Sequence, residues 1–119
     1  MLFRSEIELI GGFEINKNDF TKSLKYISSI TSSHFFNITT QEEVCILSAS
    51  NNDKGVVADR IDLSESVPNI ESSYVISHFQ KALELISNDV VTLNFFLYNN
   101  FTICILQDSS FNHLIFPTV

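Results

Sequence analysis

The sequence has few residues of several kinds, and each shortage excludes a class of protein. Its 119 residues include three Gly, two Pro, two Cys and no Trp. So few Gly and Pro mean few forced turns, charged residues at only 18% exclude a disordered chain, and two Cys are fewer than a disulfide framework usually has. No apolar run approaches the roughly 20 residues that a membrane-spanning helix needs. The remaining class is a globular protein of ordinary size, and we expect a single domain over residues 1–119.

Basic residues are also scarce. Lys and Arg number 7 against 14 Asp and Glu, which gives a formal net charge of −7. Because phosphate binding needs a basic surface, any such surface must be concentrated on one face. Residues Met1–Glu6 include charges where a signal peptide would be apolar, so we expect a cytoplasmic protein. Cys45 and Cys104 lie in apolar stretches, which predicts buried, reduced thiols.

The most informative feature is that the sequence repeats itself at an offset of 59 residues without a gap. Phe20 aligns with Phe79, and Leu24 aligns with Leu83. The same offset aligns Lys22 with Lys81, Ile27 with Ile86, Phe36 with Phe95, and Val44–Leu47 with Ile103–Leu106. Because these matches continue through helix-like and strand-like stretches, we predict one unit present twice, in halves of about 10–66 and 67–119.

Each half is predicted to contain one helix. Phe20, Leu24 and Ile27 form an apolar stripe at helical spacing, which predicts a helix over about 19–29. The second half repeats the stripe with Phe79, Leu83 and Ile86. A short extended piece is expected before each helix, at 12–15 and 67–71.

Strands are predicted after each helix. In the first half they cover 35–39 and 44–47, joined by a turn at 40–43. In the second half they cover 90–97 and 101–106, joined by a turn at 98–100. A third strand is expected at 56–63 and 112–116. The predicted fold class is α+β, a duplicated β-α-β-β-β unit with two adjacent helices packed on antiparallel sheets.

The outer faces of the two predicted helices carry most of the lysines. At about 100° per residue, Lys22 and Lys25 point away from the side of Phe20, and Lys81 and Glu84 point away from the side of Phe79. These faces hold three Lys and one Glu in a chain with twice as many acids as bases. Ordinary solvation explains any single one of these lysines equally well, but the match of Lys22 with Lys81 across the repeat favours a shared role.

The sequence contains no catalytic motif and no metal-ligand spacing. The isolated pair Gly11–Gly12 is typical of a turn or kink, and His34, His78 and His113 have no Cys or acid at ligand spacing. A catalytic Cys–His pair would need a reactive thiol, which a packed strand does not provide. We expect no enzyme, no metal and no cofactor. A small α+β enzyme stays an alternative that would need polar groups converging on an internal cavity.

The duplicated unit resembles one domain of the DNA polymerase sliding clamp, a ring-shaped processivity factor. The resemblance is strongest to the C-terminal domain of the bacterial β clamp: Ser73–Leu83 looks like its second helix, and Asp108–Val119 looks like its terminal strand. It covers nearly the whole chain from about Gly12. Members of that family carry two or three such domains per chain and close a six-domain ring, so the resemblance implies six copies of this chain. The family's terminal motif is altered here, with Phe116 in place of Met and Thr118–Val119 in place of Met-Arg-Leu.

The resemblance implies roles for three sets of residues. One set would face the phosphates of duplex DNA without reading its sequence: Lys22, Lys25, Ser29, Ser77, Lys81 and Asn88. A second set would line a pocket for short hydrophobic peptides: Thr102, Ile103, Leu114, Ile115, Phe116, Pro117, Thr118 and Val119. A terminal strand that packs on its own sheet explains this second set equally well. Ile30 and Phe35 are the expected apolar groups of a subunit interface.

The sequence therefore favours a sliding-clamp-like DNA polymerase processivity factor that assembles into a ring around duplex DNA. Its partners would be duplex DNA, the clamp-binding peptides of a polymerase or another DNA-processing protein, and further copies of itself, up to a hexamer, with no membrane. The alternative keeps the fold without DNA, as a clamp-fold adaptor or clamp-interacting protein.

Overall fold

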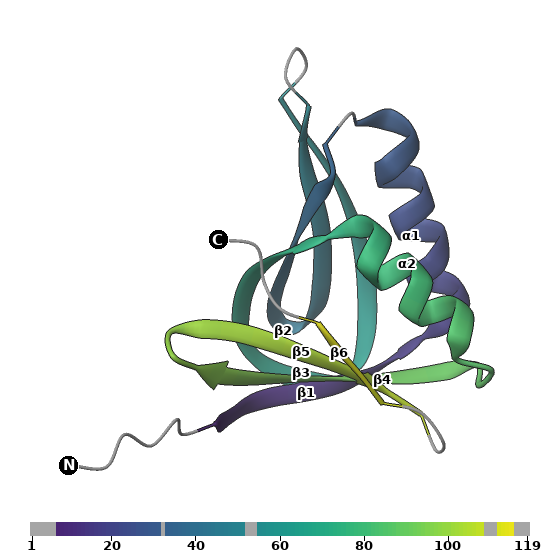
Figure 1. Ribbon diagram of the computed structural model, residues 1–119. Helices are drawn as coiled ribbons and strands as arrows, with labels where there is room; N and C mark the ends of the chain where they lie inside the picture. Colours follow the sequence, from purple (N-terminus) through teal and green to yellow (C-terminus); the bar gives the residue numbers. More distant parts are fainter. Residues whose placement is uncertain (1–6, 32, 52–54, 109–111, 116–119) are drawn as a thin grey trace.

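The computed structural model describes residues 7–31, 33–51, 55–108 and 112–115. Along the chain the elements are β1 (Glu8–Asn16), α1 (Lys17–Ile30), β2 (Phe35–Asn51), β3 (Gly55–Val75), α2 (Ile76–Leu85), β4 (Val90–Tyr98), β5 (Phe101–Gln107) and β6 (Asn112–Ile115). One antiparallel sheet has the strand order β1-β4-β5-β6, and β2 and β3 form a second, two-stranded antiparallel sheet. Figure 1 shows α1 and α2 side by side at one side of the molecule. The fold is α+β, as predicted, with two adjacent helices on antiparallel sheets.

Both helices form over their predicted apolar stripes, except that α2 ends at Leu85, one residue before Ile86. Phe20, Leu24 and Ile27 of α1 are buried, as are Phe79 and Leu83 of α2. Helix α1 begins two residues earlier than predicted, because the Asn16 side chain accepts a hydrogen bond from the backbone N–H of Asp19 at 3.1 Å and caps the helix. Helix α2 begins at Ile76 without a side-chain cap.

Aromatic side chains from both sheets and both helices meet in one core. The rings of Phe20 and Phe79 stack with centroids 5.7 Å apart, and Phe36 meets Phe79 edge-on at 5.1 Å. Tyr74 of β3 packs against Phe79 at 5.1 Å, and its hydroxyl donates a hydrogen bond to the Thr102 carbonyl of β5 at 2.8 Å. Burial raises the pKa of Tyr74, so this hydroxyl stays protonated and keeps its role as donor.

The turn predicted at residues 40–43 is wrong. Strand β2 continues through this stretch and stays paired with β3, with register shifts on either side of Glu42. The buried hydroxyl of Thr40 explains the difference, because it donates to the Pro68 carbonyl at 2.6 Å and accepts from the Ile70 N–H at 2.9 Å. Glu42 absorbs the irregularity with a positive φ of 55°. These bonds hold β2 to its partner where the polar sequence alone indicates a reversal.

The predicted duplication of a complete β-α-β-β-β unit is not confirmed. In the first half, the two expected strands after the helix merge into β2, and the expected strands at 56–63 and 67–71 merge into β3. The second half agrees with its prediction, since β4 and β5 form a hairpin whose turn residues Asn99 and Asn100 both have positive φ. The predicted strand at 112–116 is present as β6 up to Ile115, and Phe116 lies outside the described residues.

Candidate nucleic-acid interface

The N-terminal end of α1 is fastened to the chain that follows α2. The backbone N–H of Lys17 donates to the Asp89 carbonyl at 2.8 Å, and the Lys17 ammonium donates to the Ile86 carbonyl. An ammonium at this position also complements the negative end of the α2 dipole. These bonds place the start of α1 beside the end of α2, and Figure 1 shows the two helices running in opposite directions.

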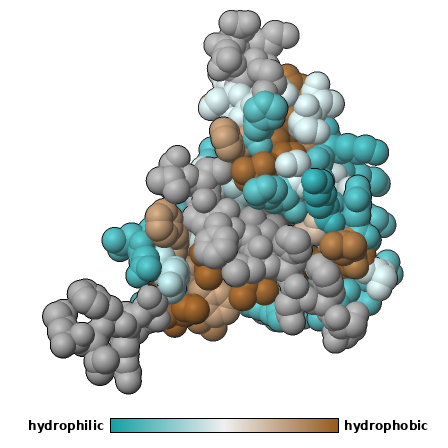
Figure 2. All heavy atoms as spheres, viewed as in Figure 1, coloured by the Kyte–Doolittle hydropathy of each residue, from teal (hydrophilic) through white to brown (hydrophobic). Residues whose placement is uncertain are grey.

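All six residues predicted to face DNA are exposed on or next to the two helices. They are Lys22, Lys25, Ser29, Ser77, Lys81 and Asn88. Figure 2 shows hydrophilic side chains over the side of the molecule where the helices lie. The structure brings the helices together: Lys25 lines the groove between them, Lys81 lies exposed on α2, and Lys22 lies on the side of α1 that faces β3. This arrangement can attract phosphate groups without selecting a base sequence.

The groove between α1 and α2 has a volume of about 500 Å³. It is lined by Lys17, Asn18, Thr21, Lys25, Gln80, Leu83 and Glu84. Two lysines and one glutamate give it a small excess of positive charge. The sequence does not indicate Lys17 as part of this groove, because its position depends on a carbonyl 69 residues further along the chain. Thr21 and Gln80 could have been found from the sequence, because they occupy equivalent positions of the two helices at the offset of the repeat.

A second groove lies between α1 and β3 and has walls of mixed charge. Lys22 and Arg60 line it together with Asp19 and Asp59. Arg60 is paired with Asp62, with Nε and Oδ1 3.0 Å apart, and its backbone N–H donates to the Asp59 carboxylate. Because these groups are well exposed, the ion pair adds little stability. The carboxylates of Asp19 and Asp59 therefore offset part of the positive charge of Lys22, which is one of the predicted DNA-facing residues.

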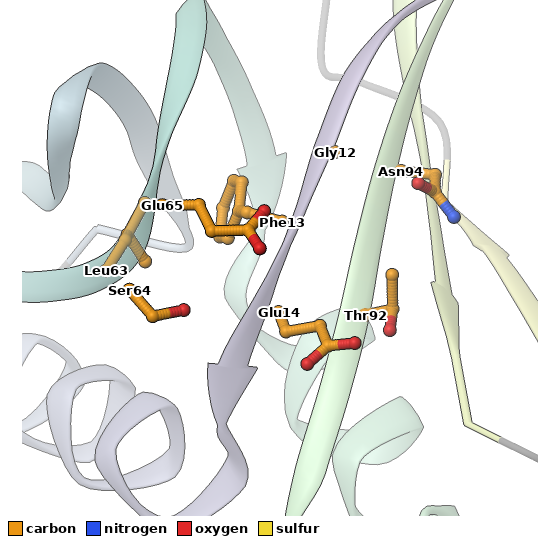
Figure 3. A pocket seen from close by; sticks show the side chains of 8 residues that line it. All are labelled: Gly12, Phe13, Glu14, Leu63, Ser64, Glu65, Thr92 and Asn94. Atoms are coloured by element: carbon orange, nitrogen blue, oxygen red, sulfur yellow. The ribbon is translucent and has the colours of Figure 1, made fainter.

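A depression between β1, β3 and β4 is acidic (Figure 3). Glu14 and Glu65 line it together with Gly12, Phe13, Leu63, Ser64, Thr92 and Asn94, and none of these side chains is basic. Figure 3 shows Glu14 of β1 beside Thr92 of β4, and Glu65 reaching across from β3. A Cβ at Gly12 would collide with the Asn94 side chain, so this position needs glycine. The two carboxylates disfavour phosphate here.

The residues predicted for the peptide pocket are only partly described. Thr102 is half-buried and Ile103 is buried, both on β5. On β6, Leu114 pairs with Ile105 and Ile115 pairs with Cys104, so β6 lies directly beside β5. The rest of this set, Phe116, Pro117, Thr118 and Val119, lies outside the described residues.

The two predicted interface residues are exposed apolar side chains. Ile30 ends α1 with 42% of its surface exposed, and Phe35 begins β2 with 49% exposed. Only four residues separate them in the sequence.

Both cysteines are free and buried, as predicted. Burial raises the pKa of the Cys45 thiol to about 12, and burial likewise raises the pKa of Cys104. Because the pKa of each thiol is higher in the folded than in the unfolded protein, the free energy of unfolding depends on pH. The contribution of the thiols is fully present below the pKa of an unfolded cysteine, about 8.5. It is lost as the pH rises from there toward the pKa of the folded protein.

The buried thiols give a first prediction. In the native protein at about pH 8, both should react with DTNB on the order of a hundredfold more slowly than in protein unfolded by urea, because the thiolate is the reactive form. Absorbance of the released thiolate measures the two rates. A rapid reaction of either cysteine in the native state would contradict its burial.

Other kinds of site are missing from the described part of the chain. Residues 7–31, 33–51, 55–108 and 112–115 contain no group of three or more His, Cys, Asp or Glu that could hold a metal ion. Within the same ranges, neither helix has the length and apolar character needed to cross a membrane.

Comparison with known proteins identifies the fold. No protein-family model and no curated protein sequence matches this chain. Solved structures do match: the beta subunit of DNA polymerase III from Thermotoga maritima superposes with a TM-score of 0.82 at 14% identity, covering 94% of this chain and 31% of that one.

Two further structures agree. The DNA polymerase sliding clamp of Bacillus subtilis gives a TM-score of 0.79 at 13% identity, covering 100% of this chain and 32% of that one. The Helicobacter pylori beta clamp, bound to a DNA ligase peptide, gives 0.76 at 17% identity, covering 94% and 30%. The chain thus spans about a third of the length of these structures. It has the fold of a single domain of the bacterial DNA polymerase III beta sliding clamps.

Proposed function

We propose that the protein is a non-enzymatic, sliding-clamp-like processivity factor that assembles into a ring around duplex DNA and tethers a polymerase or another DNA-processing protein. The observation that carries this proposal is that Lys22, Lys25 and Lys81 are all exposed on two neighbouring helices, α1 and α2. In a chain of net charge −7, this concentration of lysine on two adjacent helices favours a polyanionic partner.

Assembly is part of the proposal, because one copy has too few lysines to hold DNA. This chain spans about a third of a clamp subunit and corresponds to one domain. A ring of six domains, as in the sliding clamps that it resembles, would therefore need six copies. Two features support contacts between copies. The first feature is the sheet edges: β6 is the outer strand of its sheet, and β3 belongs to a sheet of only two strands. Outer strands readily pair with strands of other chains. Ile30 and Phe35 add exposed apolar surface that a neighbouring copy could cover.

Native mass spectrometry at physiological ionic strength tests the ring. A six-copy assembly would support it, and a stable monomer or dimer would contradict it. The second outcome favours the alternative, a clamp-fold adaptor that does not encircle DNA. The acidic surface gives this alternative its own support, because a net charge of −7 repels nucleic acid from a single copy.

We propose further that short hydrophobic peptides bind beside β5 and β6, at the set Thr102, Ile103 and Leu114–Val119. The adjacency of these two strands supports a common site, and the similar Helicobacter pylori clamp is bound to a DNA ligase peptide. A labelled hydrophobic clamp-binding peptide titrated into the wild-type protein and into Phe116→Ala should bind the variant at least about tenfold more weakly, since a Phe side chain buried at an interface is a strong contributor. Equal affinities would remove this set from the site.

We also infer that residues 10–66 and 67–119 derive from one duplicated unit, and that the protein is cytoplasmic. The stacked pair Phe20 and Phe79, and the buried pair Cys45 and Cys104, occupy equivalent positions at the offset of 59. Two free thiols are in keeping with a reducing compartment.

A further inference from the structure

The groove between α1 and α2 carries opposite charges at equivalent positions. Lys25 and Glu84 are separated by 59 residues, the offset of the repeat, and both line the groove. Thr21 and Gln80 form a second equivalent pair along the same walls. Equivalent positions of the repeat thus line both walls of the groove, and at one of these pairs the charge is opposite. A lysine at position 84 would have made the charge symmetric.

Glu84 is free to act on a ligand of the groove. Its side chain is exposed. In the described part of the chain, Arg60 and Asp62 form the one ion pair, so neither Glu84 nor Lys25 is neutralised by direct pairing. The ammonium of Lys17 at the end of the groove is already bonded to the Ile86 carbonyl. Lys25 is thus the groove's unbonded cation, and Glu84 is its opposing charge.

We propose that Glu84 limits the affinity of this helical face for the phosphates of duplex DNA. The inference rests on the proposed function. A phosphate that approaches Lys25 within the groove also approaches the Glu84 carboxylate, and the repulsion offsets part of the attraction. Because exposed charges further apart than about 8 Å are largely screened at physiological salt, the Glu84 carboxylate acts mainly on a phosphate that lies in the groove, and the effect is local. A weakened hold on each phosphate lets the protein move along the duplex without dissociating from a closed ring.

Glu84→Gln and Glu84→Lys test this role, with Glu71→Gln as the matched control. Glu71 is exposed on β3, where it pairs with Thr39, and its replacement changes the net charge by the same amount. Fluorescence anisotropy with a labelled duplex, measured over a series of salt concentrations, gives the affinity and its salt dependence. Glu84→Gln is expected to tighten binding about two- to threefold at low salt. Glu84→Lys should tighten it further and steepen the salt dependence, because each new phosphate contact adds about 0.9 to the slope.

The possible outcomes separate the inference from the proposed function. If Glu84→Gln and Glu71→Gln change the affinity equally, only net charge matters and the role of Glu84 is refuted. The proposed function survives that result as long as replacing Lys22 and Lys81 weakens binding. If the wild-type protein and all Glu84 variants fail to bind duplex DNA, both the proposed DNA contact and the role of Glu84 are refuted.

Discussion

Replacing Lys22 and Lys81 together by glutamate is expected to abolish association with duplex DNA, with a loss of more than about a hundredfold in affinity at about 0.1 M salt. These two lysines occupy equivalent positions in the repeat and are exposed on the neighbouring helices α1 and α2. In a six-copy ring the double substitution would reverse the charge at every repeat of the helical surface. Because phosphate binding releases counterions, the remaining affinity should also depend less steeply on salt.

Two milder double variants test whether the position of the lysines or only the net charge of the protein matters. Lys22→Gln with Lys81→Gln lowers the net charge by two units, and it should weaken binding about tenfold. Ser66→Glu with Asn69→Glu lowers the net charge equally, at exposed positions of β3. This control should bind within about twofold of wild type. Equal losses in the two double variants would show that the helical face has no special role, and unchanged binding of the Lys→Glu double variant would refute the DNA contact.

Phe79→Ala is expected to destabilise the protein by about 3–5 kcal/mol, the usual range for truncating a buried Phe. Phe79 has 0% of its surface exposed, and its ring contacts those of Phe20, Phe36 and Tyr74. It therefore joins α2 to α1 and to both strands of the second sheet. Since the whole free energy of unfolding of a domain is about 5–15 kcal/mol, this variant should be barely stable or unfolded at 25 °C.

Urea unfolding followed by circular dichroism measures the effect. Phe101→Ala is the matched control, because Phe101 is 40% exposed at the start of β5 and should lose less than about 1 kcal/mol. A Phe79→Ala protein whose free energy of unfolding lies within about 1 kcal/mol of wild type would contradict the central position of this ring. The same core holds the two helices together, so the variant should also lose any binding that depends on both helices.

The sequence predicted the parts of the fold that local patterns determine. Phe20, Leu24 and Ile27 recur at helical spacing, so their burial could be predicted without knowing the partner surface. Asn99 and Asn100 favour the positive φ values that a two-residue hairpin turn needs, so the turn between β4 and β5 was also predictable.

The errors arose where distant contacts override local composition. Residues 40–43 are polar and resemble a turn, yet Thr40 bonds with Pro68 and Ile70, about thirty residues away. Nothing local reveals that partner. The exposed helical face was predicted from angular positions, but the groove within it was not, because its end depends on Lys17 reaching Ile86. Periodicity gives the direction of a side chain, and only the tertiary fold gives its neighbours.

The hydroxyl of Tyr74 has a mechanical consequence. In the part of the chain that the structure describes, the two sheets share no strand ladder, and Tyr74 reaches from one sheet to a backbone carbonyl of the other. Tension applied to an outer strand of either sheet would pass through this side chain and the rings around it into the opposite sheet. The two sheets would then yield together under load, so a pull that opens a contact at one edge would be felt at the other.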